Sequence, residues 1–237
     1  MSICLVVPIR QREQTMNQYE DANNKAKAKL KPIISEFQSN APLDEYSHYT
    51  LTLLPKRAYI DSHVARTDLD ARDAFVVSMY KYLDHRLMQN AFPNYKRASH
   101  APKRIRSLLF IEHQSRDKKL MPNTLYRSPL QRDPLEHCYL HQEQISHLHA
   151  AIAIHKSCEA NILECFKRNH ASPTELCLRE DAMPDASFTK FFKNITYATL
   201  KPLADQENLE NWCVYSAKES VYRHDFPNNA RIYQHNY

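Results

Sequence analysis

Three short segments of the sequence carry residue types that together could cut a phosphodiester bond. Glu112 follows an apolar stretch, His147 and His149 are separated by one leucine, and Lys218 follows Tyr215 by three positions. Two imidazoles two residues apart on a strand point to the same side, because side chains alternate with period two. A carboxylate from a neighbouring strand can complete a metal site with them. Tyrosine is then the nucleophile that the pattern offers.

The histidine pair is best interpreted together with its sequence neighbours. The chain has 13 histidines, so a His-x-His arrangement is expected about 0.7 times by chance. The ordinary interpretation is a polar pair on the open face of a strand. Residues 150–154 are all alanine or isoleucine, as in a half-buried strand. This context favours metal ligation by His147 and His149.

The tyrosine segment reads as a helix over residues 205–222. On a helical wheel, the apolar residues gather on one side and Tyr215 on the other, together with Lys218 and Tyr222. A phenol is mostly protonated at neutral pH, and an ammonium one turn away would stabilise both the phenolate and a phosphate. The alternative is an exposed tyrosine and lysine on a solvated helix. We expect Tyr215, rather than Tyr222, to be the nucleophile. The apolar side comprises Leu209, Trp212, Cys213, Ala217 and Val221.

The order of these segments resembles the HUH endonucleases, the replication initiators, relaxases and single-strand transposases that nick DNA through a tyrosine. Residues 49–54 resemble the first strand of that family, and residues 108–112 resemble the strand that brings its acidic ligand. His147 and His149 resemble its histidine pair, and Tyr215 with Lys218 resembles its nucleophile motif. Within the superfamily, the chain looks most like a single-tyrosine rolling-circle replication initiator of a plasmid or phage.

The resemblance implies a mechanism and its partners. Glu112, His147 and His149 would hold a divalent ion, for which two imidazoles and one carboxylate suit Mn²⁺ better than Mg²⁺. Tyr215 would attack the scissile phosphate, forming a 5′-phosphotyrosine link and freeing a 3′-OH, while Lys218 steadies the phenolate or the phosphate. The expected partner is single-stranded or hairpin DNA at a replication origin, with host replication machinery as a further partner.

A basic stretch precedes the acidic segment. Residues 95–106 contain five lysines and arginines and no acid, and such a stretch could track a DNA backbone. A solvated loop is an equally good interpretation. The candidate DNA-binding residues are Lys96, Arg97, Lys103, Arg104 and Arg106.

Composition narrows the class of protein. The 237 residues include 25% charged residues, and no apolar run reaches the 18 residues of a membrane span. We therefore expect a cytoplasmic protein with no membrane partner. Six cysteines without a CxxC pair predict reduced, mostly buried thiols. Glycine is absent, which excludes glycine-rich phosphate and dinucleotide loops and predicts no nucleotide cofactor.

The periodicity predicts an α+β fold with an antiparallel central sheet flanked by helices, an HUH/ferredoxin-like or RRM-like sandwich. Residues 1–45 form an N-terminal helical lead, whose helix should end or kink at Pro32, and residues 46–237 form the nicking domain. Residues 115–144 read as a long insertion. The expected strands are 49–54, 105–114, 147–154, 175–179 and 195–200, and the expected helices are 70–90, 159–168 and 205–222.

Three other functions remain open from the sequence. The first is a nucleic-acid-binding regulator without catalysis, in which the basic stretch acts and the histidine pair is incidental. The second is a relaxase or transposase of the same superfamily. The third is a small zinc-stabilised regulator, in which two further histidines could bind metal if they lie on a helix. Its cluster would comprise His137, His141, His147 and His149.

Overall fold

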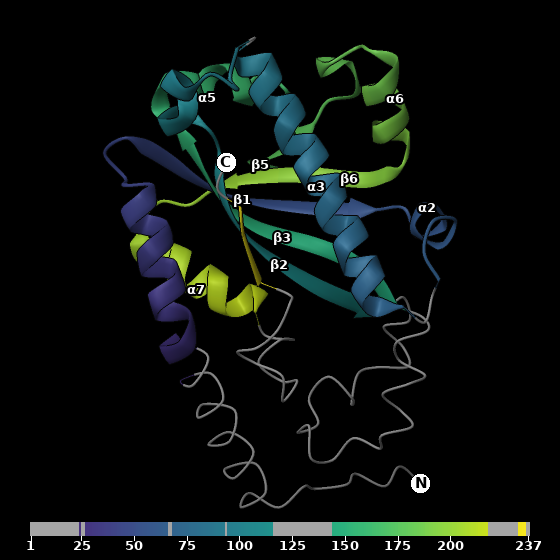
Figure 1. Ribbon diagram of the computed structural model, residues 1–237, viewed down its shortest axis with the longest axis horizontal. Helices are drawn as coiled ribbons and strands as arrows, with labels where there is room; N and C mark the ends of the chain where they lie inside the picture. Colours follow the sequence, from purple (N-terminus) through teal and green to yellow (C-terminus); the bar gives the residue numbers. More distant parts are fainter. Residues whose placement is uncertain are drawn as a thin grey trace, which may run out of the picture.

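The computed structural model describes residues 24, 27–65, 68–92, 94–115, 144–217 and 232–235. Within them, seven strands form one sheet in the order β4-β5-β6-β1-β3-β2-β7 (Figure 1). Every neighbouring pair of strands is antiparallel. The strands are β1 (Tyr46–Pro55), β2 (Arg106–Ser115), β3 (Gln144–His155), β4 (Phe166–Asn169), β5 (Ser172–Leu178), β6 (Ile195–Pro202) and β7 (Ile232–His235).

The middle of the sheet has the topology of a split β-α-β motif. The chain runs β1, α3 (Leu69–Ala91), β2, β3, α5 (Lys156–Leu163), β6, and these strands lie side by side in the order β6-β1-β3-β2. This is the β-α-β-β-α-β arrangement of ferredoxin-like folds, so the predicted fold class is confirmed. Strands β4 and β5, with α6 (Ala186–Lys193), are inserted between α5 and β6, and β7 extends the sheet beyond β2.

One face of the sheet, the α3 face, is covered by α3, α5 and α6 (Figure 1). Asp68 caps α3 by accepting a hydrogen bond from the Ala71 backbone N–H at 2.9 Å, which satisfies one of the unpaired N–H groups at its first turn. Val76, Leu83 and Leu87 then bury completely against the apolar side chains of β1, β2 and β3. The spacing of these residues is that of one helical stripe, within the helix that the sequence predicts over residues 70–90.

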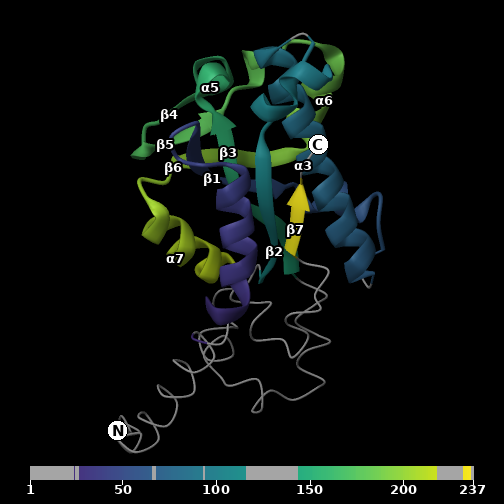
Figure 2. The same cartoon turned by 60° about the vertical axis from the view of Figure 1, so that its left-hand side comes forward.

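The opposite face, the α7 face, is covered over β2 and β3 by a helix through residues 27–40 and by α7 (Gln206–Ser216). Figure 2 shows these two helices side by side across the strands. Leu30 and Phe37 from the first helix, and Leu209 and Cys213 from the second, bury against Phe110 of β2 and its neighbours. Residues 27–40 of the predicted N-terminal helical lead therefore pack against the sheet, and residues 1–23 lie outside the described residues.

Several predicted boundaries are wrong. The first helix does not end at Pro32 but continues to residue 40. The helix expected at 159–168 spans Lys156–Leu163, and its last predicted residues belong to β4. α7 ends at Ser216, with Ala217 as its C-cap, and does not reach Tyr222. Most of the predicted insertion, residues 116–143, lies outside the described residues. The short helices α2 (Arg57–Asp61) and α6, and strands β4 and β7, were not predicted.

No helix in the described part of the chain combines the length and the apolar character needed to cross a membrane.

Candidate metal and nucleophile site

His147 and His149 lie on β3, the strand between β1 and β2. Their Nε2 atoms are 3.1 Å apart, and their rings meet nearly edge to face with centroids 4.8 Å apart. Two nitrogens each about 2.1 Å from one ion, at a right angle, are about 3.0 Å apart. The two rings therefore converge as a pair of ligands to one metal ion would.

A side chain of β1 contacts the imidazole of His149 on its Nδ1 side. Its Nδ1 lies 3.1 Å from the hydroxyl oxygen of Thr52, the residue paired with His149 in the β1–β3 register. A histidine that binds metal through Nε2 carries its proton on Nδ1, and its N–H then needs an acceptor. The Thr52 oxygen can accept that hydrogen bond, which fixes the orientation of the ring and directs Nε2 toward His147.

The third predicted ligand comes from the next strand. The β2–β3 register pairs Glu112 with His147 and Phe110 with His149. Residues directly opposite one another in an antiparallel pair have Cβ atoms about 4.5–5.5 Å apart. The backbone thus brings the Glu112 position beside the histidine pair, although the side chain of Glu112 lies outside the described part of the structure.

Helix α7 crosses the same face beside the histidines. Asp205 caps it by accepting a hydrogen bond from the Asn208 backbone N–H at 2.8 Å. Trp212 then stands edge to face with both His149 and Phe110, at centroid distances of 6.0 Å and 5.9 Å. The only tryptophan of the chain therefore fixes the position of α7 relative to the histidine pair.

Tyr215 lies one turn beyond Trp212 and is 58% exposed, whereas Leu209, Cys213 and Ala217 are fully buried. A step of three residues along a helix advances about 4.5 Å. Among the described residues, Tyr215 is therefore exposed and Leu209, Cys213 and Ala217 of the predicted apolar side are buried, whereas Val221 and Tyr222 lie outside them. Lys218 lies beyond the end of α7 and outside the described residues.

The basic stretch lies at the other end of the sheet. Arg106 pairs with Ala153, whereas Glu112 pairs with His147, and at about 3.3 Å per residue those two points are about 20 Å apart. Lys96 and Arg97 are exposed. The partly buried residues are Lys103, Arg104 and Arg106. The structure therefore does not bring the stretch next to the histidine pair.

Two of these arginines have structural contacts. The guanidinium of Arg104 donates hydrogen bonds to the backbone oxygens of Tyr95 at 3.1 Å and Lys96 at 2.9 Å. The guanidinium carbon of Arg106 lies 6.0 Å from the ring centroid of Tyr46, within the range of a cation–π contact. These two residues stabilise the loop and its junction with β2.

A row of polar positions leads away from His149 across the α7 face. His149 pairs with Thr52, Thr52 with Thr199, Thr199 with Cys177 and Cys177 with Lys167. The row crosses β3, β1, β6, β5 and β4, a distance of about 19 Å at roughly 4.8 Å per strand. The apolar contacts of helix 27–40 and α7 do not include residues of β4, β5 or β6.

Tyr197 of β6 borders this row and is 42% exposed. Among the described residues, the exposed large apolar side chains are Leu43, Tyr197 and Tyr215. Tyr215 comes from α7, which contacts His149 through Trp212, and Tyr197 comes from β6, which β1 separates from β3. The row itself includes the buried Thr199 and the exposed Lys167.

The cysteines are free thiols in the described part of the chain. Cys158, Cys165 and Cys213 are buried, and Cys177 is partly buried. Burial raises the pKa of the Cys158 and Cys165 thiols to about 11 and that of Cys213 further still. These thiols are therefore protonated and are not nucleophiles at neutral pH.

No group of three or more His, Cys, Asp or Glu side chains forms a metal site among the described residues. His137 and His141, the further members of the alternative zinc cluster, lie outside them. No protein-family model, curated protein or solved structure matches this chain.

Sequence reasoning missed three residues of this site. Thr52 alternates with apolar residues in the first predicted strand, a signal that it faces the same side as Thr50. Trp212 was assigned only to the core side of its helix, and Tyr197 was placed in a short strand without a role. Their contribution depends on which strands are neighbours, and a local pattern does not encode that.

Proposed function

We propose that this protein is a metal-dependent DNA-nicking endonuclease of the HUH type that initiates replication at a single-stranded or hairpin origin. The observation that carries the proposal is the 3.1 Å approach of the two Nε2 atoms on β3, beside a helix that presents Tyr215. A non-enzymatic DNA-binding protein would need neither the convergent imidazoles nor an exposed tyrosine one turn from Trp212, which contacts His149.

His147 and His149, with Glu112 from β2, would hold Mn²⁺ or Mg²⁺. When bound, such an ion polarises the scissile phosphate and offsets the charge that develops on it. Thr52 orients the imidazole of His149, and the ring of Trp212 shields one side of that imidazole from water. The donor set of two nitrogens and one oxygen favours Mn²⁺.

Tyr215 acts as the nucleophile. Its phenolic oxygen forms a bond to the phosphorus, the bond from phosphorus to the 3′ oxygen breaks, and the leaving oxygen takes a proton to become a 3′-OH. The phenolic proton passes to solvent, and Lys218 steadies the phenolate. The product is a 5′-phosphotyrosine link, and host replication enzymes would extend the 3′-OH.

The polar row gives the single strand a path to the site. A strand that crosses from Lys167 toward His149 would pass Tyr197, on which a base could stack, as bases stack on aromatic side chains in other single-strand binding surfaces. Lys96 and Arg97, which are exposed in the loop after α3, would contact a flanking duplex. Reduced thiols suit a protein that acts in the cytoplasm.

The test is covalent capture. The protein is incubated with end-labelled single-stranded oligonucleotides of randomised sequence and with Mn²⁺, and the products are separated under denaturing conditions. A labelled band that survives denaturation and disappears on proteolysis is the expected result. Tyr215→Phe should abolish it, whereas Tyr197→Phe, the other exposed tyrosine of this face, should retain it.

Two outcomes would reject the proposal. A labelled peptide that contains Tyr197 would show that the nucleophile is wrong. Tight binding of the oligonucleotides without any covalent band, in Mn²⁺ and in Mg²⁺, would favour the non-enzymatic regulator.

A further inference from the structure

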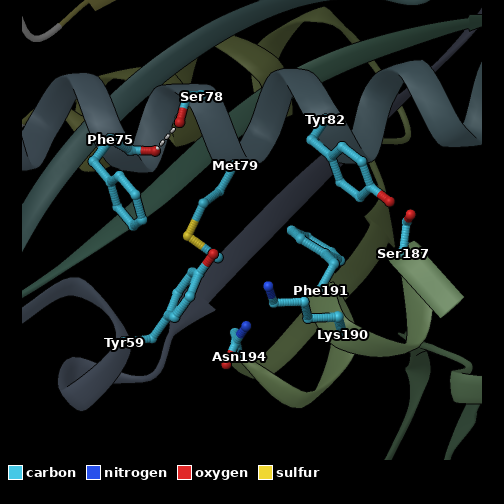
Figure 3. Close-up of a pocket in the computed structure, with 9 residues that line it drawn as sticks. All are labelled: Tyr59, Phe75, Ser78, Met79, Tyr82, Ser187, Lys190, Phe191 and Asn194. Atoms are coloured by element: carbon cyan, nitrogen blue, oxygen red, sulfur yellow. Dashed lines mark hydrogen bonds between the residues drawn. The ribbon is translucent and has the colours of Figure 1, made fainter. Parts of the chain in front are cut away.

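The α3 face has a hollow of about 330 Å³ between α3, α6 and α2, on the side of the sheet opposite the histidine pair. Two aromatic pairs stand at its ends. Tyr59 and Phe75 have ring centroids 5.5 Å apart, and Tyr82 and Phe191 have centroids 5.0 Å apart. Met79 lies between the pairs (Figure 3).

Phe75 and Tyr82 of α3 are only partly buried, whereas Tyr80, Leu83 and Leu87 of the same helix are fully buried. The ring of Tyr82 lines the hollow, but its hydroxyl oxygen is inaccessible to solvent, so a ligand in the hollow would contact the ring and not the hydroxyl.

Polar groups line the hollow on its α6 side. Figure 3 shows the amine of Lys190 extending toward Tyr59, above the side chain of Asn194. Lys190 is exposed, and the described residues that line the hollow include no aspartate or glutamate. An amide presents a hydrogen-bond donor and an acceptor together, so the hollow combines aromatic rings in two tilted pairs, one positive charge and one amide.

These features select a flat, anionic ligand. Aromatic walls bind the face of a planar ring, the ammonium of Lys190 binds a phosphate, and the Asn194 amide can read the edge of a base. An aromatic side chain of a partner protein would use the walls but neither the charge nor the amide. A volume near 330 Å³ is at the low end for ligand sites and suits one nucleotide.

We propose that this hollow binds one nucleotide unit, with its base between the two aromatic pairs and its phosphate on Lys190. The site needs no glycine-rich loop, because side chains rather than backbone N–H groups contact the ligand. The nucleotide is either free or part of a single strand. The inference does not depend on the nicking reaction, since the hollow and the histidine pair lie on opposite faces.

The experiment titrates the full chain with two fluorescent probes, etheno-AMP and a single-stranded oligonucleotide that carries one ethenoadenine. Lys190→Glu should weaken binding of at least one probe about tenfold or more, which corresponds to about 1.4 kcal/mol. Lys193→Glu is the matched control, because Lys193 is exposed on the same helix but does not line the hollow. Tyr59→Leu should weaken the same probe, because one stacking ring is lost.

The two probes separate the possible sources. A loss confined to etheno-AMP identifies a free nucleotide, a loss confined to the oligonucleotide identifies a strand, and a loss with both identifies the nucleotide unit itself. Equal effects of Lys190→Glu and Lys193→Glu, or no binding of either probe, would overturn the proposal. Quenching of Trp212 by etheno-AMP would also overturn it, since Trp212 lies beside His149 on the other face.

Discussion

The two faces of the sheet differ in how much of their surface is apolar and buried. The α3 face joins side chains from six strands, β1 to β6, to four helices, α2, α3, α5 and α6, in one apolar cluster. The α7 face has a smaller cluster under helix 27–40 and α7, and beside it lie His149, Thr52 and an exposed Tyr197. The larger apolar cluster of the α3 face therefore supplies most of the stability of the fold. The α7 face holds the polar side chains of the candidate site.

The difference shows how a small α+β fold can hold a reactive site without destabilising its core. Alternation along β3 sends Leu148, Ala150 and Ile152 to the α3 face and His147 and His149 to the other. A substitution on the α7 face should then change metal and DNA binding with little change in stability, and a substitution on the α3 face should do the reverse.

The largest expected effect is on metal affinity. His149→Ala removes one of two convergent imidazoles and should lower Mn²⁺ affinity more than about 100-fold, since loss of an outer-shell partner alone costs about 10–100-fold. The free energy of unfolding should hardly change. Titration calorimetry with Mn²⁺ measures the affinity, with His170→Ala, an exposed histidine far along the chain, as the control. Wild-type affinity in His149→Ala would refute the metal site.

The converse substitution is Leu83→Ala on the α3 face. Leu83 is fully buried, so its truncation should cost about 2–5 kcal/mol through lost burial and a residual cavity. Urea unfolding measures this cost, and Mn²⁺ affinity at a temperature where the variant is folded should stay at the wild-type value. A cost below about 1 kcal/mol would contradict the proposed division between the faces. So would a loss of Mn²⁺ affinity as large as that of His149→Ala.

A finer test concerns the hydroxyl behind His149. Thr52→Val keeps the shape of the side chain but removes the oxygen 3.1 Å from Nδ1, and Mn²⁺ affinity should fall about tenfold. Thr50→Val is the matched control, because Thr50 lies on the same strand and pairs with Ala151 rather than with a histidine. Equal Mn²⁺ affinities of the two variants would mean that Thr52 does not orient the ring.

The smallest effect is a pH dependence of stability. His48 is buried on the α7 face and donates its Nε2 proton to the Ala41 backbone oxygen at 2.8 Å. Burial lowers the pKa of His48 below its ordinary value of 6.5. The unfolded chain therefore takes up the proton first, so the contribution of neutral His48 is complete above pH 6.5 and is lost as the pH falls below it.

His48→Gln keeps an N–H donor but does not titrate. Urea unfolding between about pH 7.5 and 5 should show a steeper loss of stability in the wild type than in His48→Gln. Parallel pH profiles for the two proteins would mean that His48 does not contribute to the acid sensitivity of the fold.

The sequence predicts the parts of this fold whose signal is local. The alternation in β1, β2 and β3 and the stripe of α3 lie within single elements, and the structure has those elements to within a few residues. The position of Glu112 opposite His147 follows from the antiparallel pairing of two predicted strands.

The rest depends on contacts between distant segments. Residues 166–168 look helical from their neighbours but form β4, because Phe166 pairs with Leu178 and is buried in the α3 cluster. The five basic residues look alike in the sequence, yet Arg104 is engaged by the backbone of its own loop. A local sequence pattern predicts neither the strand at residues 166–168 nor the loop contacts of Arg104.

Strand β7 has a consequence for how the chain folds during synthesis. It pairs with β2 through contacts such as Ser107 with His235, so the loop that this pairing closes spans more than half of the chain. Pairing over such a separation forms late, because the loss of chain entropy comes before any gain from contacts. On a ribosome, β2 is made long before β7 and keeps one edge unpaired in the interval. That edge is a template for pairing with a neighbouring nascent chain, so the yield of folded protein should depend on how crowded the translating ribosomes are.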